Sequence, residues 1–239
     1  DMGIATDKGN TKWHNQFPEG FEEQAETIPA IAKNWKKKSF RVEMSLGDFL
    51  EKYKDDERPY TVSHKIDGDS SMVMFDGEES IIWNHRGRWR RDFHITDEIT
   101  ASLKKAKVTK AMINGELYAV DSDGLTLPLN EVGSIIVSPK TIERQNQIRF
   151  AAFDLSLLEI LGDVVIDSES PYADRMKALK PLLKGKSIAV VNSWRGEGDM
   201  SAVQKAWDAG MKEPNFEGLV LRFDDEPKSI KIKMKGTAD

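Results

Sequence analysis

A lysine followed by an acid and a glycine stands directly after an alternating, strand-like run. The stretch SHKIDGDSS places Lys65 at the end of YTVSH, with Asp67 and Gly68 next along the chain. A lysine amine attacks an electrophile only when it is deprotonated, and burial or neighbouring cations favour that state. By itself K-x-D-G is weak evidence, because it arises by chance in roughly one chain in twenty of this length. Lys65 is a candidate nucleophile only if other segments support it.

Three further segments carry residues suited to the same chemistry. INGELY places Glu116 in a predicted strand, AFDLSLLEILG places the aromatic Phe153 directly before an acid, and FEGLVLR places Glu217 among apolar residues. A carboxylate in such surroundings is costly unless a metal, a ligand or a cation accompanies it. These segments therefore favour a site that holds a charged ligand.

A row of lysines closes the chain. IKIKMKG alternates Lys231, Lys233 and Lys235 on one side of a strand, where their repulsion is tolerable if an anion or solvent faces them. The order, type and spacing of these segments resemble the nucleotidyltransferase core shared by ATP-dependent DNA ligases, RNA ligases and mRNA capping enzymes. Over roughly residues 40 to 239, the chain looks most like the adenylation domain of an ATP-dependent DNA ligase.

The resemblance implies a covalent mechanism. In that family the lysine of K-x-D-G attacks the α-phosphate of ATP, expels pyrophosphate and forms a lysyl-AMP, and Lys65 is the matching residue, with Asp67 completing the catalytic motif. Glu116 and Glu217 match two acids expected to act through a divalent metal. The implied cofactors are therefore ATP, carried as covalent AMP on Lys65, and Mg²⁺ or Mn²⁺.

The resemblance also implies the contacts to the nucleotide. Ser63 falls where the family contacts the adenine amine, and Phe153 matches the aromatic that stacks on adenine. The other implied nucleotide-binding residues come from the same motifs: His64, Lys65, Ile66, Gly68, Glu116, Lys231, Lys233 and Lys235.

The family's K-x-K motif fits the closing lysines in two registers. Both Lys231 with Lys233 and Lys233 with Lys235 satisfy it, and Asp239, four residues after Lys235, favours the second pair. The pair would neutralise charge on the α-phosphate as it becomes five-coordinate.

A basic segment suits nucleic-acid binding. HRGRWRR interleaves a tryptophan with cations, a mixture that fits phosphate contacts and base stacking, and its candidate nucleic-acid residues are Arg86, Arg88, Arg90 and Arg91, with Trp89 for stacking. The expected partner is nicked double-stranded DNA.

Two departures from the family keep other functions open. Ser70 stands where ligases and capping enzymes usually have arginine, and His85 stands where ligases have arginine in S-R-N-G. The alternatives are an RNA ligase, a capping-type nucleotidyltransferase, or a nucleotide-binding module without catalysis. The family continues into an oligonucleotide-binding (OB) barrel where this chain stops, so we expect full activity to need that additional domain.

Composition limits the remaining possibilities. The 239 residues carry a net charge of -5 and no cysteine, which excludes a thiolate metal site and a cysteine nucleophile. Neither an apolar run of about 18 residues nor a signal-peptide segment is present, so we expect an intracellular protein, in cytoplasm, nucleoid or nucleus, with no membrane partner. We also expect a monomer.

The predicted elements point to an α+β fold of mostly antiparallel sheets flanked by helices. The resemblance implies that this is the nucleotidyltransferase fold of ligase adenylation domains, with a nucleotide cleft between these parts. Residues 1–38 are expected to be an N-terminal extension, and 39–239 the nucleotidyltransferase domain. Ser45 is predicted to cap a helix through SLGDFLEKY, and Thr96 a helix through DEITASLKKAK. SIAVVNSW is expected to form one strand, and Asp199 to cap the helix that follows.

Overall fold

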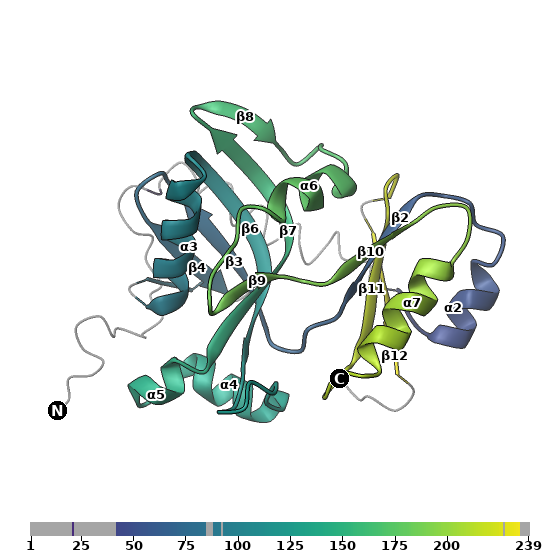
Figure 1. The fold of residues 1–239 in the computed structure, drawn as a ribbon, viewed down its shortest axis with the longest axis horizontal. Coiled ribbons are helices and arrows are strands. Elements are labelled where there is room, and N and C mark those ends of the chain that lie inside the picture. The colour runs from purple at the N-terminus through teal and green to yellow at the C-terminus, as the bar shows by residue number, and fades with distance from the viewer. Residues whose placement is uncertain (1–20, 22–41, 85–87, 92, 227, 235–239) are drawn as a thin grey trace. The chain divides into compact units, whose positions relative to one another are not determined.

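The computed structural model describes residues 21, 42–84, 88–91, 93–226 and 228–234. The chain forms two compact units. Unit 1 comprises Asp1–Ala32, Asp67–Ser170 and Asp174–Val190; unit 2 comprises Lys33–Ile66, Pro171–Ala173 and Val191–Asp239. Each unit combines helices with a mostly antiparallel sheet, which confirms the predicted α+β class (Figure 1). None of the helices in the described ranges is long and apolar enough to cross a membrane.

Unit 2 is built on a five-stranded sheet. Adjacent strands in this sheet run antiparallel, except β1 and β12 at one edge, which run parallel. In spatial order the strands are β1 (Val42–Ser45), β12 (Ser229–Lys233), β11 (Gly218–Phe223), β2 (Tyr60–His64) and β10 (Ser193–Gly196).

The two faces of this sheet differ in polarity because successive side chains of a strand point to opposite sides. One face is apolar, and helices α2 (Leu46–Lys52) and α7 (Ser201–Gly210) pack on it through a shared core. The other, which we call the polar face, carries Glu43, Ser63, Lys231 and Lys233. As predicted, Ser45 caps α2, and its hydroxyl accepts a hydrogen bond from the backbone N–H of Asp48.

Unit 1 is built on a larger sheet, whose strands come from the middle of the sequence. Strand β9 (Ile188–Val190) runs parallel to β7 (Ile148–Ile160). All other pairs of adjacent strands in this sheet are antiparallel. The remaining strands, in spatial order, are β5 (Trp89–Arg90), β4 (Ser80–Asn84), β3 (Asp69–Phe75), β6 (Val108–Ala119), β7 (Ile148–Ile160) and β8 (Asp163–Ile166).

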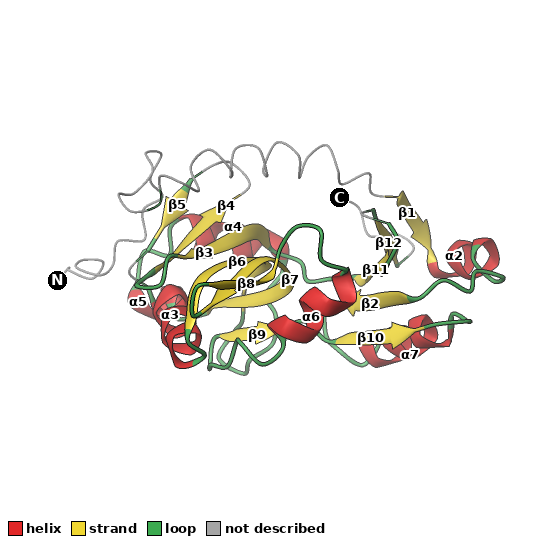
Figure 2. Cartoon of the chain, turned by 90° about the horizontal axis from the view of Figure 1, so that it is seen from above, coloured by secondary structure: helices red, strands yellow, loops and turns green. Residues whose placement is uncertain are grey.

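Helices supply part of the core of unit 1. Helix α3 (His94–Lys105) buries one stripe made of Ile95, Ile99 and Leu103. Within the described ranges, the helices that remain are visible in Figure 2: α4 (Leu129–Val137), α5 (Ile142–Gln145) and α6 (Tyr172–Leu179).

A cluster on the sheet of unit 1 includes one residue from the predicted N-terminal extension. Phe21 is fully buried there. Its neighbours in the cluster come from four strands: Met72, Met74, Ile81, Trp83, Trp89 and Met112. Phe21 therefore belongs to the core of unit 1.

Three local predictions were wrong. Helix α3 begins at His94, two residues before the predicted cap, and the Thr96 hydroxyl instead donates to the backbone oxygen of Phe93. The N-cap of α7 is Met200, although a carboxylate oxygen of Asp199 accepts from the backbone N–H of Ser201. SIAVVNSW divides into β9 in unit 1 and β10 in unit 2, because a local apolar run does not reveal which sheet it joins.

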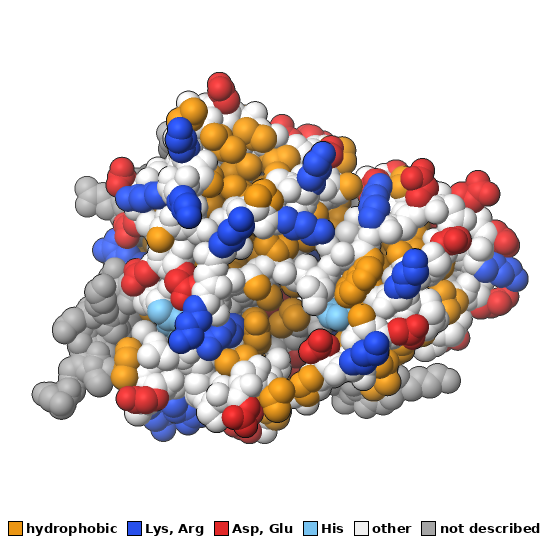
Figure 3. Space-filling view, in the orientation of Figure 1, with side chains coloured by type: hydrophobic (Ala, Val, Ile, Leu, Met, Phe, Trp, Pro, Cys, Tyr) orange, Lys and Arg blue, Asp and Glu red, His pale blue; other side chains and the backbone are white. Residues whose placement is uncertain are grey.

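Apolar side chains are exposed at the turn between β7 and β8. Leu161 is 72% exposed, and Val164 and Val165 follow it on the edge strand. Figure 3 shows apolar side chains gathered over the end of unit 1 that carries β8.

Candidate active site

The predicted nucleophile contacts one of the predicted acids within unit 2. Lys65 follows the last residue of β2, and its backbone N–H donates to the carbonyl oxygen of Gly218 at 2.9 Å. Its Nζ forms an ion pair with the carboxylate of Glu217, and the side chains are only 17% and 24% exposed. The structure therefore brings the lysine of K-x-D-G against the acid of the EGLV segment.

Gly218 allows β11 to pair closely with β12 beside this ion pair. Its φ is +143°, a conformation that residues with side chains rarely adopt, and a Cβ there would lie 2.1 Å from the carbonyl oxygen of Ile232. Gly218 also stands opposite Lys233 in the register of β11 and β12. No side chain from β11 therefore fills the space between Lys65 and Lys233.

Two of the three lysines near the end of the sequence form ion pairs with Glu43, an acid that the sequence analysis did not identify. Lys231 Nζ lies 3.1 Å from Glu43 Oε1, and Lys233 Nζ lies 3.1 Å from Glu43 Oε2. Partial burial opposes ionisation of Glu43, but hydrogen bonds and charge from the two lysines hold its pKa below the usual range. No local signal marks Glu43, because its role depends on pairing between β1 and β12.

Ser63 and His64 point to opposite faces of the sheet. Ser63 lies on the polar face in the same row as Lys231, and its hydroxyl donates to the carbonyl oxygen of Val220 at 3.4 Å. The His64 ring lies 4.8 Å from that of Trp194, and its Nε2 is 3.1 Å from the carbonyl oxygen of Ala206 on α7. The structure therefore separates the His64 side chain from the lysines.

The remaining residues of the first two motifs lie in unit 1. Ser70 on β3 pairs in register with Glu116 on β6. A Cβ on Gly68 would lie 2.1 Å from the carbonyl oxygen of Leu117, and a Cβ on Gly115 would lie 2.3 Å from the ring of Phe150. Both glycines thus permit close packing beside the motif acids, Asp67 and Glu116.

The predicted adenine-stacking residue lies at an irregularity of β7. Asn114 pairs with Asp154, whereas Gly115 pairs with Ala152, so Phe153 is the additional residue of a β-bulge. A bulge changes the direction in which a side chain points, and bulges are common near functional sites. The position of Phe153 half-buried on this bulge is consistent with its predicted role.

The acid after Phe153 is engaged by an arginine of α6. Arg175 Nε donates to Asp154 Oδ1 at 2.8 Å, and Arg175 Nη2 donates to Asp154 Oδ2 at 3.2 Å. Arg175 Nη1 also donates to the carbonyl oxygen of Ser170. This pair connects the bulge with α6, a link that the sequence analysis did not predict.

The prediction that Arg90 binds nucleic acid is wrong. Arg90 has no exposed surface, its Nη1 donates to the carbonyl oxygen of Ile136 at 3.0 Å, and burial lowers the pKa of its guanidinium to about 9. Trp89 is also buried, in the cluster with Phe21, so it is not exposed for base stacking. Alternation on a short strand puts one residue on each face, and both residues of β5 are buried.

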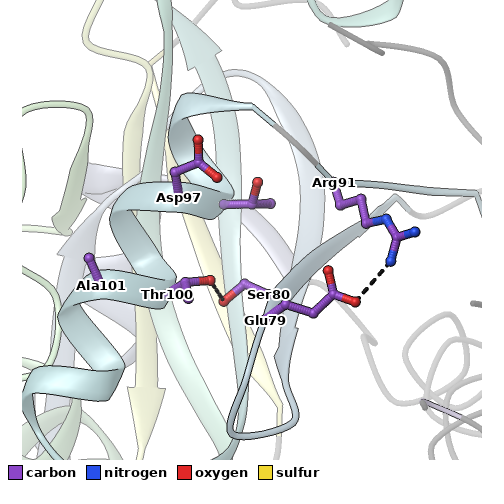
Figure 4. Close-up of a pocket in the computed structure, with 7 residues that line it drawn as sticks. Glu79, Ser80, Arg91, Asp97, Thr100 and Ala101 are labelled. Carbon is purple, nitrogen blue, oxygen red and sulfur yellow. Dashed lines mark hydrogen bonds and ion pairs between the residues drawn. The ribbon is translucent and has the colours of Figure 1, made fainter. Parts of the chain in front are cut away.

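Arg88 and Arg91 remain accessible. Arg88 is exposed, and Arg91 forms an ion pair with Glu79 at 2.8 Å beside a pocket of about 260 Å³ (Figure 4). The lining of this pocket contains no predicted catalytic residue, and consists of Glu79, Ser80, Arg91, Thr96, Asp97, Thr100 and Ala101. Arg86 and Lys235, which were predicted to bind nucleic acid and nucleotide, lie outside the described residues.

Several solved structures resemble this chain in fold. One described as Pmar-Lig_PreS3 aligns with a TM-score of 0.56 and 16% identity over 87% of this chain and 50% of that one. A mycobacterial DNA ligase D complexed with ATP and MES aligns with a TM-score of 0.50 and 18% identity over 81% and 60%. The ligase domain from M. tuberculosis LigD gives 0.50 and 18% over 82% and 59%.

The chain thus spans about half to three fifths of the length of these structures. The comparison with curated proteins returned no match. A family model described as "ATP dependent DNA ligase domain" matches residues 33–234, which is most of the chain and includes Lys65, Glu116 and Glu217. This match supports the DNA ligase prediction and none of its alternatives. The chain belongs to the ATP-dependent DNA ligase domain family.

Proposed function

We propose that this chain is a DNA ligase adenylation domain in which Lys65 carries AMP as a covalent intermediate. The observation that supports this best is the ion pair between Lys65 and Glu217, on a sheet whose polar face also carries Lys231 and Lys233. Lys65 is a potential nucleophile, and Glu217 is an acid suited to a metal. The other two lysines are cations suited to phosphate.

The reaction requires the Lys65–Glu217 ion pair to open. A protonated amine has no lone pair, so Lys65 Nζ has to leave Glu217 and lose a proton to solvent before it bonds to the α-phosphorus of ATP. The bond from that phosphorus to the bridging oxygen breaks, and pyrophosphate leaves with the electron pair. Lys233 would neutralise the charge that accumulates on the α-phosphate in the transition state.

We propose that a divalent metal binds here together with the phosphates of ATP. Mg²⁺ prefers oxygen ligands and is commonly bound by one or two carboxylates together with substrate phosphates. In unit 2, Glu217 would supply such a carboxylate. When bound, the metal would neutralise phosphate charge and stabilise the leaving pyrophosphate.

The later steps follow from the chemistry of the intermediate. AMP would pass from Lys65 to the 5′-phosphate of a nick in double-stranded DNA, and a 3′-hydroxyl would then displace it. We propose that this sealing takes place inside the cell, with a monomeric enzyme, and that it requires an OB-fold domain in addition to residues 39–239.

The proposal is tested by incubating the chain with labelled ATP and Mg²⁺ and measuring covalent AMP by gel and by intact mass. We expect one adenylate, located on Lys65 by peptide mapping, and none with labelled GTP. Lys65→Ala should form no adenylate yet still bind ATP. Lys205→Ala is the matched control, because Lys205 is an exposed lysine of α7 in the same unit.

Adenylate on another lysine, or none on the wild-type chain and on a version extended by an OB-fold domain, would disprove the assignment. For the substrate, the extended version is given a nicked DNA duplex and a nicked RNA duplex. Sealing of the RNA duplex alone would replace the DNA ligase proposal with an RNA ligase.

A further inference from the structure

We propose that Glu43 is a positioning residue for adenylation, which acts by holding Lys231 and Lys233 at the place where the α-phosphate is neutralised. This inference rests on the proposed function and adds a residue outside the motifs of the chain. One carboxylate bridges both lysines, with one oxygen 3.1 Å from each Nζ.

The strand pairing fixes this arrangement. Glu43 stands opposite Lys231 on the parallel strands β1 and β12, and Ser45 stands opposite Lys233. Ser45 is already engaged as the cap of α2. Glu43 is therefore the residue of β1 whose side chain is available to the lysine row.

Electrostatics explains why the lysine row needs such a partner. Lys231 and Lys233 are only 14% and 16% exposed, so water screens their mutual repulsion poorly. Each lysine also has a flexible four-carbon stem whose rotamer freedom is lost when it is fixed in one geometry. A shared carboxylate offsets the repulsion and keeps both stems ordered before the nucleotide arrives.

The position of Glu43 relative to Lys65 makes the effect relevant to the reaction. Lys233 stands opposite Gly218, and the carbonyl oxygen of Gly218 accepts the backbone N–H of Lys65. Lys233, which Glu43 holds, is thus separated from Lys65 by one strand. That strand is β11, and its residue opposite Lys233 is Gly218, which has no side chain. Loss of Glu43 would leave the lysines present but less ordered.

The expected signature separates the rate of adenylation from the affinity for ATP. Removing the carboxylate makes the polar face more positive, so the triphosphate should bind no more weakly. The transition state depends on cations that are already oriented, so the rate constant for adenylate formation should fall about tenfold, the size expected for loss of one charge-assisted contact. A purely structural residue would weaken binding and rate together.

The test is Glu43→Gln, with the single-turnover rate of Lys65 adenylation and the ATP dissociation constant measured separately. We expect the slower rate, unchanged or tighter ATP binding, and an intermediate rate for Glu43→Asp, whose shorter side chain reaches the lysines less well. Glu51→Gln is the matched control, because Glu51 also pairs with a lysine, Lys54, but at an exposed position on α2.

A double-mutant cycle identifies the route of the effect. In a Lys233→Ala background, where Glu43 has lost the lysine that would neutralise the α-phosphate, Glu43→Gln should slow the residual adenylation by much less than tenfold. A Glu43→Gln variant as fast as wild type, a variant with weakened ATP binding, or fully additive losses in the cycle would each overturn the inference. Absence of adenylate from both the wild-type chain and the version extended by an OB-fold domain would instead count against the proposed function.

Discussion

Arg175 donates two hydrogen bonds to the carboxylate of Asp154, and so connects α6 to the strand that carries Phe153. Both side chains are largely buried, and a third hydrogen bond joins Arg175 to the backbone of Ser170. A buried charge left without its partner is strongly destabilising, so this pair should be sensitive to change on either side.

Arg175→Ala should lower the free energy of unfolding by about 3 kcal/mol, because it leaves the Asp154 carboxylate buried without its bidentate partner. Urea denaturation followed by circular dichroism measures the change. Lys104→Ala is the control, since its pair with Glu78 is exposed and should contribute less than about 1 kcal/mol. Equal effects of the two substitutions would contradict the assignment.

Phe21→Ala should destabilise unit 1 by about 3 kcal/mol, because a fully buried aromatic ring is lost from its cluster. The same cluster contains Trp83 and Trp89, so the near-ultraviolet circular dichroism of the folded protein should change as well. Leu161→Ala, which truncates an exposed side chain, should leave stability within about 0.5 kcal/mol. If Phe21→Ala behaves like Leu161→Ala, Phe21 is not part of the core.

Arg88 and Arg90 should respond in opposite ways to substitution. Arg88→Ala should weaken binding to nicked DNA and reduce the salt dependence of that binding by about one counterion, with little effect on stability. Arg90→Ala should cost about 3 kcal/mol of stability through lost packing and lost hydrogen bonding, with unchanged DNA affinity of the folded protein. Fluorescence anisotropy at several salt concentrations, with urea denaturation, distinguishes the two. A drop in DNA affinity for folded Arg90→Ala would contradict its burial.

Stability should depend on pH through Glu43. Because Lys231 and Lys233 hold its folded-state pKa below the ordinary value of 4.5, the ionised carboxylate stabilises the fold above that pH. The stabilisation should be lost as the pH falls below 4.5 and through the folded-state pKa. The difference in unfolding free energy between wild type and Glu43→Gln should therefore shrink in acid. A difference that stays constant with pH would show that Glu43 does not bind the lysines as an anion.

Periodicity and turn chemistry predicted the type of most elements, because these signals are local. The alternation in YTVSH and SIKIK corresponds to β2 and β12, and Ser45 caps α2 as expected. The same signals missed α4 and α5 and gave no indication that Val191 and Asn192 separate two sheets. Helix boundaries also shifted, because the position of α3 is set by the packing of its apolar stripe against the sheet.

The sequence by itself determined the chemistry at stake: a lysine in K-x-D-G, acids at Glu116 and Glu217, and alternating lysines in the order typical of one family. Only the tertiary structure decided that Glu43 holds two of those lysines, that Asp154 binds Arg175, and that Arg90 is buried. Motifs and alternation are properties of neighbouring residues. Contacts between residues 43 and 231, or 154 and 175, depend on strand pairing and helix packing between distant segments, which no local pattern contains.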